Sequence, residues 1–379
     1  MKKRALFILS LLSIALVATP QKSRVASVIQ LIESEKFDEA KEAVELAISN
    51  DYTIQWPRTY YAKGLLCQKA FESGFDKNDI KKLNLYPDQL FLAYESYEKA
   101  LRLNSKDRLK TLISQQYIAL ANDFQKLGSQ LYGKKDYVKA ARALEHALFV
   151  SKSPLLSVSV DTNLIFNTAL AAFESKNWEK AIGYLTGLNK DNYGTLAALL
   201  LFQSYMESGD SIRAEEVLQD GIERYSHDVD IVLQLVDLLA ETNRTDLAIA
   251  LLDSEAAMNP GNYVFPWTKG LLKQRINAYL DAIECYKAAS LINKEEVMIY
   301  FNMGICYYNI GVELDETARS TKSNIQYRDV KAKAQVAFKE AVTWLEKAHE
   351  MKPSHQQTTE KLYDLYNRLR MREKLNSLE

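Results

Sequence analysis

The sequence predicts an all-α protein in which short helices stack as a solenoid. Three observations lead to this fold class. The chain contains 13 glycines and 7 prolines in 379 residues, which implies few turns and much helix. The stretch 124–147 carries two helical patterns joined by a short polar turn. A small residue that opens the second helix of such a pair recurs along the chain at a nearly constant spacing.

The stretch 124–147 shows the pattern most completely. Apolar or small residues recur at i, i+3, i+4 and i+7 before the Gly133–Asp136 turn and at i, i+3, i+7 and i+10 after it, so each set shares one helical face. The residues concerned are Phe124, Leu127, Gly128 and Leu131, then Tyr137, Ala140, Leu144 and Ala147. Gly128 and Ala140 are small where the two helices would cross, so we expect their backbones to approach closely.

The recurring small residues set the period of the stack. They are Ala40, Ala93, Ala140, Ala181, Ala214, Ala248, Ala282 and Ala341, at successive spacings of 53, 47, 41, 33, 34, 34 and 59. Three consecutive spacings near 34 are a specific signal. This order of large, small and large residues resembles the tetratricopeptide repeat, a helix-turn-helix unit of about 34 residues. The resemblance implies a right-handed superhelix of about eight repeats, closed by a C-terminal capping helix.

The chain is accordingly divided into five segments. We expect a signal peptide at 1–18, N-terminal repeats at 22–160 with an insert at 72–88, regular repeats at 161–294, a C-terminal repeat with a long helical hairpin insert at 295–353, and a capping helix at 354–379.

The elements follow in order. The first repeat spans Arg24–Asn50, and the second begins after Trp56-Pro57. The 17 surplus residues at 72–88 predict an ordered loop or a short extra helix. Lys106–Leu120 is expected to extend the helix that carries Phe124, and Ser151–Ser159 is the most loop-like segment.

The later repeats are regular until the eighth. The sixth repeat ends at Asn259-Pro260, because proline cannot continue a helix, and the seventh contains Gly270, Ala282 and Ala289. The eighth holds about 25 extra residues, close to seven turns of helix. Both of its helices can therefore lengthen in phase, and we expect a protruding hairpin with its tip near Thr317–Asn324. Thr358–Lys374 then forms the capping helix.

The first residues resemble an export signal. Lys2-Lys3-Arg4 precedes an uncharged stretch, Ala5–Ala18, that is too short to span a bilayer, which takes about 20 residues. We expect cleavage after Ala18 and an exported protein, periplasmic or, without an outer membrane, secreted. An uncleaved anchor is the alternative.

Three cysteines, Cys67, Cys285 and Cys306, leave at least one free thiol. Cys285 and Cys306 fall on consecutive helices, so a disulfide is one interpretation. Packing as small buried hydrophobes is the expected one.

The resemblance also implies a binding surface, because first helices line the concave face in this family. The partner-binding residues expected there are Tyr61, Leu65, Tyr132, Phe166, Leu170, Phe173, Leu199, Met206, Leu233, Trp267, Leu271, Gln274, Phe301, Ile305 and Tyr308. Their balance is apolar and aromatic, as in protein-binding surfaces. Carboxylate-clamp members carry Asn after the first-helix glycine, and no Asn stands at that position here, so such a clamp is not expected.

Catalysis has little support in the sequence. The four histidines show no metal-ligand spacing, and we find no G-x-S-x-G, Walker A or G-x-G-x-x-G motif. We expect no enzyme activity, no cofactor and no metal. The 48 basic and 49 acidic residues nearly cancel, which gives no reason to expect nucleic acid.

The function predicted is a non-catalytic scaffold or adaptor of the bacterial cell envelope, which binds a protein or peptide in an aromatic-lined groove. No stable membrane insertion is expected after signal removal. One alternative is a self-associating structural component, paired through its end helices or its hairpin. A second alternative is a helical envelope enzyme acting on glycan or peptide, for which the expected groove offers only Asp237 as a central carboxylate.

Overall fold

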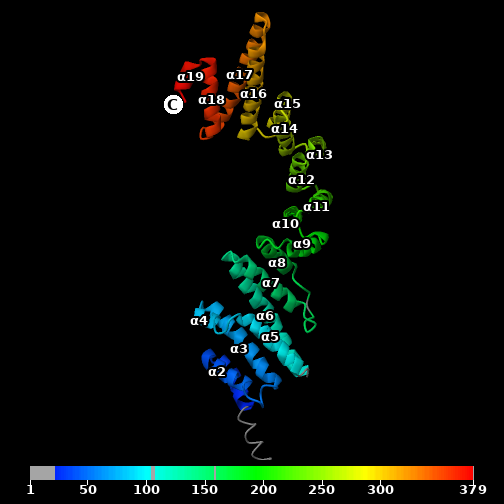
Figure 1. Cartoon of the computed structure of the whole chain (residues 1–379), viewed down its shortest axis with the longest axis vertical. Helices are drawn as coiled ribbons and strands as arrows, with labels where there is room; N and C mark the ends of the chain where they lie inside the picture. Colours follow the sequence, from blue (N-terminus) through cyan, green and yellow to red (C-terminus); the bar gives the residue numbers. More distant parts are fainter. Residues whose placement is uncertain (1–21, 104–106, 158, 379) are drawn as a thin grey trace, which may run out of the picture. The chain divides into compact units, whose positions relative to one another are not determined.

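The computed structural model describes residues 22–103, 107–157 and 159–378. Over these residues the secondary structure is helix and turn, with no strand, so the predicted all-α repeat fold is confirmed (Figure 1). The chain forms two compact units, the first ending at Val217 and the second beginning at Leu218. The expected signal peptide lies outside the described residues.

The first unit is a series of paired helices. After a helix over residues 22–33 come α2 (Phe37–Ile48), α3 (Pro57–Asp76), α4 (Ile80–Leu83), α5 (Gln89–Leu103), α6 (Asp107–Gly133), α7 (Tyr137–Ser151), α8 (Thr162–Glu174), α9 (Trp178–Lys190) and α10 (Thr195–Glu207). The pairs α3–α5, α6–α7 and α8–α9 pack closely. Helix α11 (Ser211–Arg224) contains the division between the two units.

The second unit continues the pattern and ends in longer helices. It contains α12 (Val229–Glu241), α13 (Thr245–Met258), α14 (Val264–Arg275), α15 (Tyr279–Ile292), α16 (Val297–Ser320), α17 (Asn324–Met351), α18 (Gln356–Leu369) and α19 (Arg372–Asn376). Here α12 pairs with α13, α14 with α15 and α16 with α17.

The turns inside most of the pairs have the same construction; the turn between α16 and α17 is different. The second residue after the first helix adopts a left-handed backbone, as Lys135 (φ 61°), Asn243 (φ 60°) and Asn277 (φ 61°) do. The next amide donates back to a carbonyl five residues earlier, for example Asp136 to Leu131 at 3.0 Å and Arg244 to Leu239 at 2.8 Å. This is the Schellman arrangement, which satisfies the last carbonyls of the helix and reverses the chain. The same turn recurs at Glu35, Lys176 and Gly209.

The close helix crossing predicted at Gly128 is present. A Cβ atom added at Gly128 would lie 2.6 Å from Cγ of Leu144 and 3.4 Å from the carbonyl oxygen of Ala140, so the crossing requires glycine. The equivalent glycines of other pairs, Gly64, Gly270 and Gly304, meet Tyr97, Tyr286 and Leu345 in the same way.

The insert at 72–88 differs in part from its prediction. Helix α3 continues to Asp76, so the first residues of the segment are helical, and α4 supplies a short extra helix. Asp79 caps α4 by accepting from the amide of Lys81 at 3.0 Å. Lys77 and Lys82 reach back to Glu35 at 2.6 and 2.8 Å, which holds the insert against the first hairpin.

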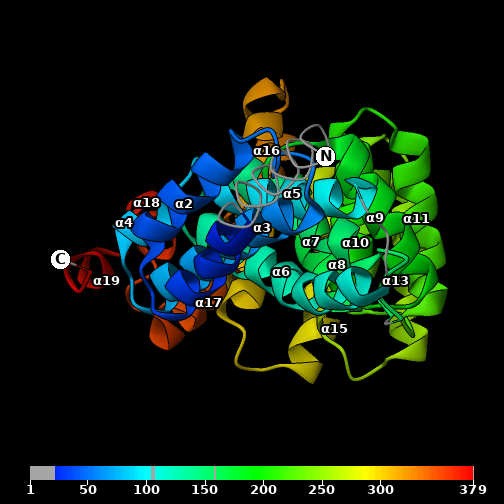
Figure 2. The ribbon, with the colours of Figure 1, turned by 90° about the horizontal axis from the view of Figure 1, so that it is seen from below.

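Helices α16 and α17 form a hairpin whose turn lies at residues 321–323 (Figures 1 and 2). Gly311 on α16 permits its close approach to α17, because an added Cβ would meet the Phe338 ring at 2.6 Å. The buried Asp315 on α16 accepts hydrogen bonds from Lys331 on α17 and from Arg319. The hairpin is therefore packed and ion-paired well toward its tip.

The prediction of a single capping helix near the C-terminus is wrong in one respect, because the segment forms two helices. Arg370 adopts a left-handed backbone (φ 56°), and the amide of Met371 donates to the carbonyl of Tyr366 at 2.9 Å. These features end α18 at Leu369 and begin the separate helix α19. The apolar face of α18 is nevertheless buried, through Leu362, Leu365 and Tyr366.

The three cysteines are free thiols, so the disulfide interpretation of Cys285 and Cys306 does not hold. Burial raises the pKa of Cys67 and of Cys306 to about 12, as expected of small hydrophobes inside the core. Among the described helices, none has the length and apolar character needed to cross a bilayer.

Candidate partner-binding surfaces

The residues predicted to bind a partner all lie on first helices of the pairs, and we call this set the first-helix face. Its members on the first unit are Tyr61 and Leu65 (α3), Tyr132 (α6), Phe166, Leu170 and Phe173 (α8), and Leu199 and Met206 (α10). Its members on the second unit are Leu233 (α12), Trp267, Leu271 and Gln274 (α14), and Phe301, Ile305 and Tyr308 (α16). Tyr61, Leu65 and Phe301 are buried, and the other members are half-buried.

Aromatic members in the first unit each pack on one neighbouring ring. Phe166 stacks on Tyr193 with ring centroids 5.0 Å apart, and the Tyr193 hydroxyl donates to Asn163 at 2.8 Å. Phe173 meets the edge of Trp178 at 5.4 Å. These contacts fix the orientation of the rings while leaving part of each ring accessible.

Several members of the first-helix face in the second unit form hydrogen bonds to other residues of the chain. Gln274 accepts from the Tyr286 hydroxyl at 2.8 Å and from the Cys306 thiol at 3.4 Å. Tyr308 donates to Asp364 on α18 at 2.8 Å. These two polar groups therefore hold helices together. Trp267 differs, because its buried Nε1 has no hydrogen-bond partner among the described residues.

Phe301 is also covered from the C-terminal side. Its ring meets that of His355, the residue before α18, edge to face at 5.0 Å. The capping segment therefore takes up part of the surface that the sequence assigns to a partner.

A cleft of about 440 Å³ in the first unit lies beside the predicted residue Tyr61, and we call it the amino-terminal cleft. The helix at 22–33, α3 and α6 form its walls, and all three are first helices. It is lined by Val25, Ala26, Ile29, Gln30, Glu33, Trp56, Arg58, Tyr61, Arg108, Leu109 and Leu112. Only Tyr61 belongs to the first-helix face as predicted.

The chemistry of the amino-terminal cleft combines an apolar wall with two cations. Tyr61, Leu109 and Leu112 give aromatic and aliphatic surface. Arg58 and Arg108 are exposed, and neither forms an ion pair with another described residue. Since Glu33 is the only carboxylate in the lining, the cleft carries an excess of positive charge.

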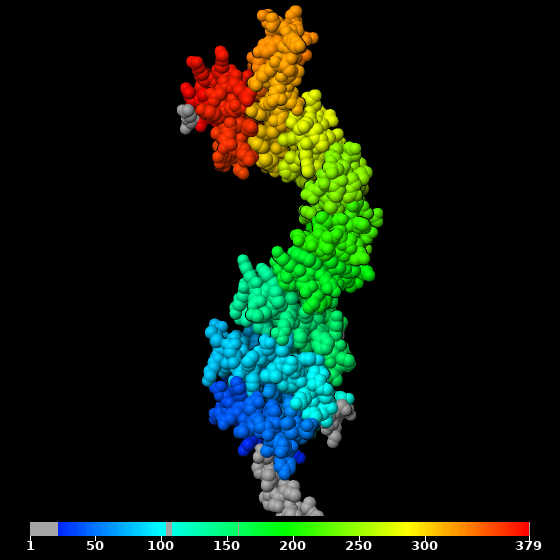
Figure 3. All heavy atoms as spheres, viewed as in Figure 1, coloured from blue at the N-terminus to red at the C-terminus, as the bar shows by residue number. Residues whose placement is uncertain are grey.

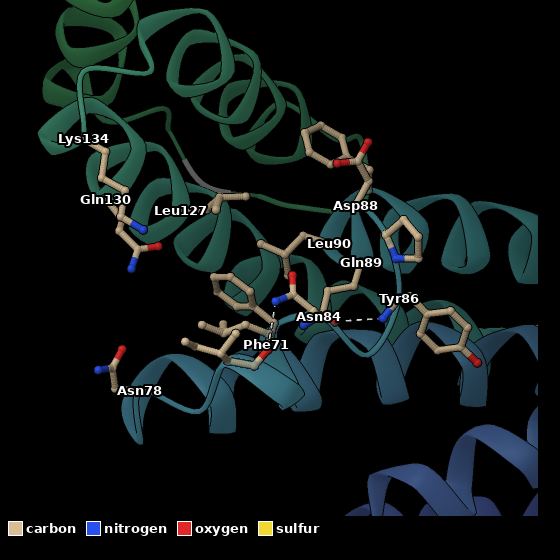
Figure 4. Close-up of a pocket in the computed structure, with 14 residues that line it drawn as sticks. Phe71, Asn78, Asn84, Tyr86, Asp88, Gln89, Leu90, Leu127, Gln130 and Lys134 are labelled. Atoms are coloured by element: carbon tan, nitrogen blue, oxygen red, sulfur yellow. Dashed lines mark hydrogen bonds between the residues drawn. The ribbon is translucent and has the colours of Figure 1, made fainter.

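The insert builds a second opening of about 480 Å³, which we call the insert cleft (Figure 4). The end of α3, helix α4, the following loop, the start of α5 and the end of α6 enclose it. In Figure 4 the side chains of Phe71, Leu90 and Leu127 gather at its centre. Gln130 and Lys134 stand at its open side.

The loop that closes the insert cleft is held by one glutamine. Gln89 donates to the carbonyl of Lys82 at 3.1 Å and accepts from the amide of Tyr86 at 3.3 Å. Left-handed backbones at Asn78 (φ 52°) and Asp88 (φ 47°) turn the chain at the two ends of the segment. The asparagine and the length of the insert are visible in the sequence, but its enclosure of a cleft is not.

A buried carboxyl group in the first unit was not anticipated. Asp123 on α6 is 2% exposed and accepts from the amide of Gln68 on α3 at 3.1 Å. Tyr97 on α5 donates to the same Gln68 at 2.9 Å. Burial, together with the nearby charge of Glu72, raises the pKa of Asp123 to about 7.

The position of Asp123 favours a structural role over catalysis. Its partners come from α3 and α5, so the network joins three helices, and Asp123 lines neither of the clefts described above. Asp237, the central carboxylate expected in the groove, is exposed on α12. No cluster of histidine, cysteine and carboxylate side chains suited to a metal occurs among the described residues.

Comparison with known proteins identifies the repeat. Residues 199–263 match the family model described as tetratricopeptide repeat. No curated protein matches the chain. A tetratricopeptide-repeat protein from Bacteroides fragilis is 18% identical, with a TM-score of 0.34 over 65% of this chain and 98% of that one. The C-terminal part of another tetratricopeptide-repeat protein, from Cytophaga hutchinsonii, is 11% identical, with a TM-score of 0.45 over 67% of this chain and 92% of that one.

A third solved structure, of the protein MamA, is 18% identical, with a TM-score of 0.34 over 50% of this chain and 95% of that one.

Proposed function

We propose that this chain, a tetratricopeptide repeat protein, is a non-catalytic scaffold that binds a partner protein on its first helices. The amino-terminal cleft is the anchoring site in this proposal. Its occupant is a segment of the partner that carries apolar side chains together with one or more carboxylates. The observation that carries the proposal is the open cleft between three first helices, with two exposed arginines beside an apolar wall.

The physical basis is a surface that is formed before the partner arrives. The paired helices around the cleft are fixed by close glycine crossings and Schellman turns, so little conformational entropy is lost on binding. Tyr61 and Leu112 offer apolar area to bury, and Arg58 and Arg108 offer charge that attracts and orients a carboxylate. Arg58 also lies 6.0 Å from the Trp56 ring centroid, which supports the guanidinium.

We also propose that the protein acts after export, in the cell envelope. The support is the basic and then apolar pattern of residues 1–18. Fusing these residues to a reporter that functions only outside the cytoplasm tests this part. We expect export of the fusion, and retention in the cytoplasm would contradict it.

Capture of partners from envelope extracts tests the scaffold proposal. The bait is the chain from Thr19, and bound proteins are identified by mass spectrometry. We expect one dominant partner, and we expect the double variant Arg58→Glu, Arg108→Glu to reduce its capture at least tenfold, because a repulsive pair replaces two attractive charges.

The matched control changes the same charges elsewhere. Lys152 and Lys190 are exposed in the same unit and lie outside the amino-terminal cleft. Lys152→Glu, Lys190→Glu should capture the partner as the unmodified chain does. Equal loss in both double variants would assign the effect to net charge, and unchanged capture by the arginine variant would place the interface elsewhere.

A further inference from the structure

A groove on the second unit is not used by the proposed function. It measures about 340 Å³ and lies between the start of α15 and the hairpin of α16 and α17. Leu280, Ile310, Leu314 and Val336 supply its apolar surface, and Lys333 and Glu340 stand on α17 beside it. We call it the hairpin groove. Leu280 is 68% exposed and Val336 is 61% exposed, so the groove leaves large apolar side chains in water.

The groove exists because two neighbouring helices from successive pairs differ in length. Helix α15 has 14 residues, whereas α16, which packs on it, has 24. At about 1.5 Å per residue, α16 runs past its neighbour by about 15 Å. Figure 3 shows the orange end of the hairpin extending past the yellow surface of α14 and α15. The apolar stripe of α16 beyond Ile310 therefore lacks the helix that covers it in a regular repeat.

We propose that a second copy of this chain fills the hairpin groove, through antiparallel pairing of the two α17 helices about Val336 and Ala337. The first reason is shape. Beside Val336, Ala332 is exposed and small and Ala337 is buried, so no bulky side chain at these two positions keeps two α17 helices apart, and each Val336 can reach the other copy's apolar lining. A twofold interface of this kind uses the same patch on both copies.

The second reason is the order of charges on the same face. Lys333 and Glu340 are seven residues apart, which is two helical turns or about 10 Å. Their midpoint coincides with that of Val336 and Ala337. One twofold axis therefore places each Lys333 opposite Glu340 of the second copy.

The intramolecular contacts leave this pairing open. Lys333 forms an ion pair with Asp329 at 2.8 Å on the exposed surface, and Glu340 forms none with the described residues. Lys287 on α15 is a cation whose charge interacts with that of Glu340, but it already forms an ion pair with Glu284 at 2.8 Å, so Glu340 can still accept a cation from outside. An unrelated partner helix would need only the apolar surface, whereas a second copy also uses the spacing of the two charges.

Charge exchange gives a direct test, because the proposed axis fixes which residues meet. Sedimentation equilibrium of the chain from Thr19, at about 1 to 200 µM, should show a monomer–dimer equilibrium of micromolar strength. Lys333→Glu and Glu340→Lys should each weaken the dimer at least tenfold, since like charges then face each other. An equimolar mixture of the two variants should form the heterodimer, because its two cross-pairs are again of opposite sign.

Controls separate this interface from other effects. Lys339→Glu lies on α17 next to Glu340 but outside the groove lining, and should leave the dimer unchanged. Val336→Glu should give a monomer, whereas Val138→Glu, at a similarly exposed valine (70%) on α7, should not. Circular dichroism monitors folding of each variant.

Three results would overturn the proposal: a monomer throughout the concentration range, a dimer insensitive to Val336→Glu, or no heterodimer in the mixture. A monomer that captures a foreign protein through Val336 would assign the groove to a different partner. The proposal is independent of the amino-terminal cleft. A monomeric Val336→Glu chain that still captures its partner through Arg58 and Arg108 would leave the proposed function intact.

Discussion

Single residues decide how closely the helices of each pair approach. Gly128 faces Leu144 at a distance that no side chain permits, and Gly270 faces Tyr286 in the same way. The sequence predicted a close approach of the two helices at Gly128 and Ala140, because small residues at fixed positions of a helical pattern mark a crossing. The sequence could not predict the burial of Asp123, because its partner Gln68 is 55 residues away and Tyr97, which donates to Gln68, is 26 residues from Asp123, so the three meet only through the fold.

Gly128→Ala tests the crossing. The added methyl group would overlap Leu144, so we expect a loss of about 1–3 kcal/mol in the free energy of unfolding, measured by urea denaturation. Gly183→Ala in α9 is the matched control, because nothing lies within 4 Å of its Cβ position. There alanine should stabilise by up to about 1 kcal/mol through helix propensity. Equal effects at both sites would contradict a tight crossing.

Asp123→Asn tests the buried carboxyl group. The pKa of Asp123 is about 7 in the folded chain and near 3.8 when exposed, so the folded state binds a proton more tightly. Its contribution to stability is therefore present at low pH and declines as pH rises between those two values. Since asparagine does not titrate, the stability of wild type relative to Asp123→Asn should fall from pH 5 to pH 8. A difference that is independent of pH would show that Asp123 is ionised throughout.

At the scale of elements, most of the structural features that the repeat period does not predict lie in the two inserts. Extra length at 72–88 and 295–353 is visible as irregular spacing of the small residues. The insert cleft depends on the left-handed turns at Asn78 and Asp88 and on the hydrogen bonds of Gln89, which no repeat pattern encodes. In α16, Phe301 and Tyr308 follow the expected spacing, but α18 and the residue before it contact both.

Asp315 tests how the hairpin is held. Lys331 hydrogen-bonds Asp315 and holds the pKa of this carboxyl below its usual value, with a smaller contribution from Arg319. The stabilisation is therefore present above the ordinary aspartate pKa and is lost as pH falls through the lowered value. Asp315→Asn should increase hydrogen-exchange rates of amides in 312–335 at neutral pH, with α12 and α13 unchanged. Unaltered exchange at the tip would mean that Gly311 and Phe338 packing suffices.

At the scale of the whole molecule, the sequence supports a repeat protein more firmly than any partner. The regular spacing falls at Ala181–Ala282, and the segment that matches the family model, 199–263, lies inside it. The two compact units each contain first helices with aromatic side chains. Which of these surfaces a partner uses depends on side-chain covering, and a periodic pattern does not contain that information.

The measurement that tests the central claim most directly is partner capture by the double variant Phe166→Glu, Trp267→Glu. Both residues are half-buried on first helices, one in each unit, and Trp267 has an unpaired Nε1. We expect the helical circular dichroism signal to survive and capture of the dominant partner to be lost. Capture at the wild-type level, by a folded double variant, would contradict a partner that extends along the first helices beyond the amino-terminal cleft, and would leave Arg58, Arg108 and the other residues of that cleft as the whole binding site.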